Sequence, residues 1–103
     1  MSSTSEPPHL SSHHRDTLLQ IFEEPTNHNV EWHDVMSLLG AVGSIEEQHD
    51  DMFRLRIGSE TEVLRRPKDK DIDGQQLVDL RRILASAGYD TVAADLVEKG
   101  KEA

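Results

Sequence analysis

The chain has 103 residues, no cysteine and a net charge of −9, and 35% of its residues are hydrophobic. This length suits a single domain with a modest core, and the absence of cysteine excludes disulfides and thiolate metal sites. No apolar run approaches the roughly 20 residues that span a bilayer, and residues 1–14 lack the apolar and basic parts of a signal peptide. We therefore expect a soluble cytoplasmic protein that makes no membrane contact.

The negative charge lies in the first half of the chain. Residues 1–52 hold ten acids and one base, whereas residues 53–103 hold ten of each. The stretch 53–71 is locally basic, with six bases against four acids. An acidic protein is repelled by phosphate backbones, so only this local patch is expected to favour nucleic acid. The alternative is that these bases are solvated charges of strands and loops.

The first half predicts a tail and two helices. Residues 1–11 have little to bury, so we expect a disordered tail before a single domain over 12–100. Ser11 or Ser12 caps a helix that ends near Glu24, because Pro25 follows. A second helix is expected over 31–41, where apolar residues recur at helical spacing and Gly43 follows as a stop.

The period then changes to that of strands. Residues 53–57 alternate apolar and basic side chains, which indicates a half-buried strand, with a weaker strand over 44–49 before it and another over 61–66 after it. For the turn between the strands over 53–57 and 61–66, we predict a three-residue loop from Gly58 to Glu60. It would set Glu62 opposite Arg56 as an ion pair and keep carboxylates off the core face.

Two helices close the chain, one from about Gly74 to Ala87 and a short one from Asp90 to Gly100. The order predicts an α+β fold. A small three-stranded antiparallel sheet carries helices packed on one face, with extra helices at the N-terminal and C-terminal ends.

Residues 69–74 match the opening of a calcium-binding EF-hand loop, with aspartate at alternate positions followed by glycine. That loop requires a bidentate glutamate at its twelfth position, and here the twelfth residue is Leu80. The same residues suit a helix start, with Asp73 as N-cap and Gln76 closing a capping box. We therefore expect a helix cap rather than a calcium site, and we expect no metal or other cofactor.

Of the six histidines, only His49 lies next to the predicted sheet, beside Asp50 and Asp51. A histidine near carboxylates is able to act as a general base. The others show no recognised metal-ligand spacing, so we expect structural or incidental roles for them. Trp32 is expected to be a large part of the core, since the chain has few aromatic residues.

Residues 31–89 resemble the HicA family of small bacterial toxins, which are ribonucleases of toxin–antitoxin pairs with a fold like the double-stranded RNA-binding domain. The likeness is carried by "EWHDVMSLLGAVG", "FRLRIG", "VLRRPKDKDID" and "LVDLRRILASAGY". Arg66-Pro67-Lys68 matches the family's basic-Pro-basic segment, and the run from Ala87 to Tyr89 matches its closing helix end. The resemblance implies RNA or an antitoxin-like protein as partner.

The family's catalytic histidine precedes the second strand in a Gly-Ser-His triplet. Here that place falls near Asp51 or Met52, and His49 is two or three residues early. We therefore expect a HicA-like binding module without ribonuclease activity. RNA would be held by five basic residues, Arg54, Arg56, Arg65, Arg66 and Lys68. The alternatives are an active mRNA interferase that uses His49 and a purely structural protein-interaction module.

Overall fold

The computed structural model describes residues 10–23 and 30–101. The elements, in chain order, are α1 (Ser12–Phe22), α2 (Trp32–Val42), β1 (Ser44–Glu47), β2 (Met52–Ile57), β3 (Glu60–Arg65), α3 (Gly74–Ser86) and α4 (Tyr89–Lys101). The strands form one antiparallel sheet in the order β1-β2-β3. The predicted α+β class and its three-stranded sheet are confirmed.

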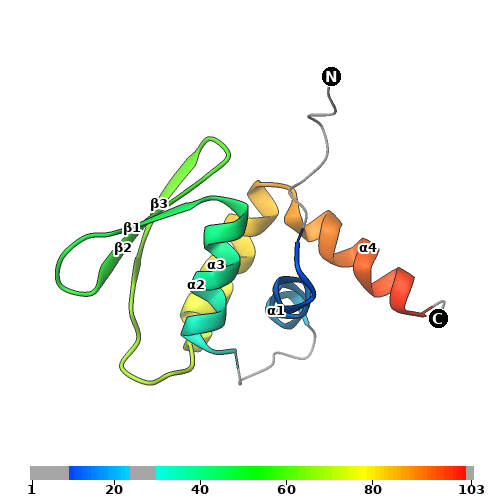
Figure 1. Cartoon of the computed structure of the whole chain (residues 1–103), viewed down its shortest axis with the longest axis horizontal. Coiled ribbons are helices and arrows are strands. Elements are labelled where there is room, and N and C mark those ends of the chain that lie inside the picture. Colours follow the sequence, from blue (N-terminus) through cyan, green and yellow to red (C-terminus); the bar gives the residue numbers. More distant parts are fainter. Residues whose placement is uncertain (1–9, 24–29, 102–103) are drawn as a thin grey trace.

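The molecule has three layers, as Figure 1 shows. The sheet lies on one side, α2 and α3 cover one of its faces, and α1 and α4 lie beyond them, away from the sheet. Alternation in β2 places Phe53, Leu55 and Ile57 in the core, while α2 contributes Leu38 and Leu39, which are fully buried. Arg54 and Arg56 of β2 therefore lie on the opposite face of the sheet.

Ser11 caps α1 as predicted, but the folded part of the chain begins before residue 12. Residues 1–9 of the expected tail lie outside the described part of the chain. Leu10, however, is only 6% exposed and joins the core, and Ser11 caps α1 by accepting a hydrogen bond from the His14 amide at 3.2 Å. Both residues therefore belong to the folded domain. His14 also bonds Ser37 of α2 at 2.8 Å, so it helps to hold the two helices together.

The turn between β2 and β3 corrects the predicted register. Glu60 pairs with Ile57 and Glu62 with Leu55, so the connection has two residues, and Gly58 takes a positive φ of 61°. The next residues of β3 favour this register. It places Leu64 opposite Phe53 in the core and leaves Val63, with 55% exposure, on the other face. Glu62 is only half-buried, and its carboxylate lies 3.5 Å from the Arg82 guanidinium on α3.

The capping box at α3 is confirmed. The Asp73 carboxylate accepts from the Gln76 amide at 2.8 Å, and the Gln76 side chain accepts from the Asp73 amide at 3.2 Å. The Gln76 side-chain amide also donates to the Arg65 carbonyl at 2.6 Å. The start of α3 is thereby tied to the end of β3.

Candidate nucleic-acid interface

Three of the five predicted basic residues share the open face of the sheet. Arg54 and Arg56 alternate with the core residues of β2, and Arg65 on β3 lies opposite Met52. All three arginines are exposed. Residues i and i+2 of a strand are separated by about 6.7 Å. The row from Arg65, opposite Met52, through Arg54 to Arg56 therefore covers roughly two such separations. We call this surface, formed by the outward residues of the three strands, the sheet face.

The sheet face carries more bases than acids although the protein is acidic. Its one acid in the strands is Glu46, whose carboxylate lies 3.7 Å from Arg54. The remaining outward strand residues are uncharged: Ser44, Met52, Thr61 and Val63. Charges within a Debye length of about 8 Å dominate the local potential at physiological salt. Among the outward strand residues, three arginines stand against one glutamate, so this face is richer in bases than the chain as a whole, whose net charge is −9.

The other two predicted residues, Arg66 and Lys68, lie on a different surface. The Arg66 guanidinium packs over the Phe53 ring, 5.7 Å from its centroid, and Phe53 points to the core side of the sheet. Trp32 meets the same ring edge-on at 5.6 Å. These side chains line a groove of about 460 Å³, here called the Trp32 groove, together with His33, Met36, Pro67, Lys68, Asp69 and Lys70.

Backbone hydrogen bonds fix the walls of the Trp32 groove. The Trp32 amide donates to the Lys70 carbonyl at 2.7 Å, and the Ile72 amide donates to the Val30 carbonyl at 2.9 Å. At the other end of the segment, the Arg66 amide donates to the Asp51 carbonyl at 2.9 Å. The segment after β3 is therefore held against the first turn of α2, where Figure 1 shows it passing.

Lys70 is a member of this groove that sequence reasoning left out. Its ammonium lies 3.8 Å from the Glu31 carboxylate and is 79% exposed. The signal was present, since Arg66, Lys68 and Lys70 occupy alternate positions in the chain. What the sequence did not reveal is that Trp32 and Phe53 lie beside them.

The sheet face and the Trp32 groove meet at the edge strand β3. A hollow between β3 and the start of α3 is lined by Arg65, Arg66 and Lys68. Acids line its other side, Asp73 and Asp79 among them. Arg65 and Arg66, which belong to the two surfaces, thus both line this hollow.

His49 lies on the turn between β1 and β2, outside the hollows described above. The Met52 amide donates to the His49 carbonyl, and the Gln48 amide donates to the Met52 carbonyl. Gln48 and His49 therefore both lie opposite Met52, as in a β-bulge. The His49 ring is 93% exposed, and its only hydrogen bond to the described residues joins Nδ1 to Asp50 at 3.4 Å. His49 lines neither the Trp32 groove nor the hollow between β3 and α3.

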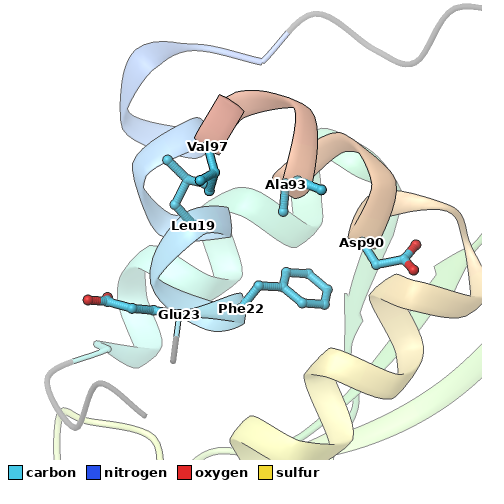
Figure 2. Close-up of a pocket in the computed structure, with 7 residues that line it drawn as sticks. Leu19, Phe22, Glu23, Asp90, Ala93 and Val97 are labelled. Carbon is cyan, nitrogen blue, oxygen red and sulfur yellow. The ribbon is translucent and has the colours of Figure 1, made fainter. Parts of the chain in front are cut away.

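Another hollow lies between α1 and α4 (Figure 2). It has a volume of about 680 Å³ and apolar walls, formed by Leu19, Phe22, Ala93, Ala94 and Val97. The Phe22 ring projects toward Asp90, and the Glu23 carboxylate points to the opposite side. This lining suits apolar side chains and disfavours phosphate.

No cluster of three or more histidine, aspartate or glutamate side chains able to hold a metal occurs among the described residues. Within the same residues, no helix is long and apolar enough to cross a membrane. Comparison with protein-family models, curated proteins and solved structures found no match for this chain.

Proposed function

We propose that this chain is a HicA-like RNA-binding module that acts by binding, without cleaving RNA. The observation that carries the proposal is the placement of Arg54, Arg56 and Arg65 on one uncovered sheet face with a single acid among them. Arginine pairs with phosphate oxygens through a planar fork of donors, so such a face suits the backbone of a nucleic acid.

The position of His49 favours binding over catalysis. General base catalysis needs a titratable group within hydrogen-bond reach of the reacting hydroxyl in a bound substrate. The His49 ring projects into solvent from a turn that also carries Asp50 and Asp51. Two carboxylates at this position repel an approaching phosphate, whereas the arginines attract it a few residues away.

The proposal predicts a definite salt dependence. Three phosphate contacts to a single strand give a slope of about −2 for log K against log salt, since each contributes roughly −0.7. Affinity for a short single-stranded RNA should then fall about twentyfold between 50 and 200 mM salt. Arg56→Ala should weaken binding at low salt and reduce that ratio to about sevenfold.

The matched control is Lys99→Ala, which removes the same charge from α4, in the layer away from the sheet. Fluorescence anisotropy of a labelled RNA measures all three proteins. Equal losses from Arg56→Ala and Lys99→Ala would show that only net charge matters and would overturn the sheet face as the site. Wild-type protein that binds no RNA, even at low salt, would overturn the function and favour a protein partner.

Cleavage is tested with the same preparations. Incubation with a structured RNA should leave it intact for wild-type protein and for His49→Ala alike. Cleavage by wild-type protein that His49→Ala abolishes would replace the binding proposal with the mRNA interferase.

A further inference from the structure

The composition of the Trp32 groove goes beyond what phosphate binding requires. A surface that only holds phosphates needs cations and hydrogen-bond donors, as on the sheet face. The Trp32 groove adds two aromatic rings and a methionine to three cations, and Phe53 and Trp32 remain only 7% and 9% exposed. An apolar floor with a basic rim suits a flat ring that carries an anionic group on either side.

We propose that the Trp32 groove binds one unpaired nucleobase of an RNA strand, stacked on the Arg66 guanidinium, an assignment that rests on the proposed function. The guanidinium carbon of Arg66 lies 5.7 Å from the centroid of the Phe53 ring, and Arg66 is exposed. A base that enters from solvent therefore reaches a guanidinium placed beside an aromatic ring. Unpaired bases of RNA stack on aromatic side chains and on arginine planes in this way.

The cations on the rim fit the phosphates that flank such a base. Lys68 and Lys70 follow Arg66 at alternate positions and line the same groove. Asp69 is the one acid among its lining residues. The volume of about 460 Å³ falls within the usual range of small-ligand sites, and a single base is small enough to enter.

The groove needs little rearrangement to receive a base. The bond from the Trp32 amide to the Lys70 carbonyl joins its two walls, and the bond from the Arg66 amide to the Asp51 carbonyl holds the Arg66 backbone to the turn before β2. A wall already ordered in the free protein loses less conformational entropy on binding. Arg65 and Arg66 are neighbours in the chain but lie on opposite sides of the sheet. An RNA strand that passes around the edge strand β3 therefore runs from the sheet face into the Trp32 groove.

The test compares two probes that share a sugar–phosphate backbone. One is a short oligouridylate and the other is the same strand with its bases removed. Trp32 is the only tryptophan in the chain, so its fluorescence reports on the groove. Oligouridylate should change the Trp32 emission and bind about tenfold more tightly than the abasic strand, because stacking adds to the phosphate contacts.

The variants separate stacking from charge. Arg66→Lys keeps the positive charge but removes the planar guanidinium, so it should abolish the preference for oligouridylate while retaining affinity for the abasic strand. Arg65→Lys, the matched control on the sheet face, should keep the preference. The wild-type comparison needs no variant, so it decides the question even where Arg66→Lys disturbs folding.

Failure of this inference differs from failure of the proposed function. Equal affinity for both strands, with no change in Trp32 emission, would overturn the base site and leave phosphate binding on the sheet face intact. An absence of binding to either strand would overturn both.

Discussion

The turn between β1 and β2 stores backbone strain that one substitution should release. Asp50 and Asp51 have φ values of 61° and 62°, and they are the only non-glycine residues with positive φ in the described part of the chain. Two successive residues of this kind form the tight turn that matches the twist of antiparallel strands, where asparagine and glycine are preferred. An L-residue in this conformation costs about 1–2 kcal/mol, whereas glycine pays no such penalty.

The expected gain in the free energy of unfolding is the difference between two opposing effects of the substitution. Asp51→Gly relieves the left-handed conformation, about 1–2 kcal/mol, but makes the unfolded chain more flexible, which costs about 0.5–1 kcal/mol. The variant should therefore be more stable than the natural chain by about 0.5–1 kcal/mol. For a domain of this size, each kcal/mol raises the melting temperature by about 4–8 °C.

Asp69→Gly is the matched control. It makes the same chemical change in an exposed loop, at a residue outside the positive-φ region. Only the flexibility term applies there, so stability should fall by about 0.5–1 kcal/mol. Urea unfolding followed by Trp32 emission measures both variants, and they should differ by about 1–2 kcal/mol. Equal changes in the two variants would refute the reasoning, because any gain would then come from the lost charge rather than from the turn.

Three further predictions concern other parts of the fold. Asp73→Ala should lower stability by about 1 kcal/mol through the lost bond to the Gln76 amide, while Asp73→Asn stays close to the natural chain in urea unfolding. Burial raises the pKa of Tyr89, the only tyrosine, so its absorbance at 295 nm should titrate above pH 10 in the folded protein. The contribution of the neutral phenol to the free energy of unfolding should be fully present below about pH 10 and should be lost as the pH rises further. A titration midpoint equal to that of free tyrosine would contradict this. Gly43→Ala places a Cβ against the Arg56 carbonyl oxygen, so the start of β1 must shift; amide exchange in β2 should accelerate, and unchanged protection would argue against that contact.

Local chemistry in the sequence determined much of this fold. Helix caps, glycine stops and apolar spacing depend on residues within a few positions of one another, so the helices begin and end close to where they were expected. The capping box of Asp73 and Gln76 is such a feature, and it accounts for the calcium-like string without a metal. The alternation in β2 likewise predicted that Arg54 and Arg56 share one face.

Tertiary packing decided what local pattern left open. The hairpin register turned on whether Glu62 could face the core side, and Arg82 from α3 made that possible by lying 3.5 Å away. Leu10 is buried as part of the hydrophobic core, which composition does not reveal. Arg65 and Arg66 went to different surfaces, and the groove arose because Trp32 from α2 meets Phe53 from β2. These contacts join residues far apart in the chain, and only the folded arrangement brings them together.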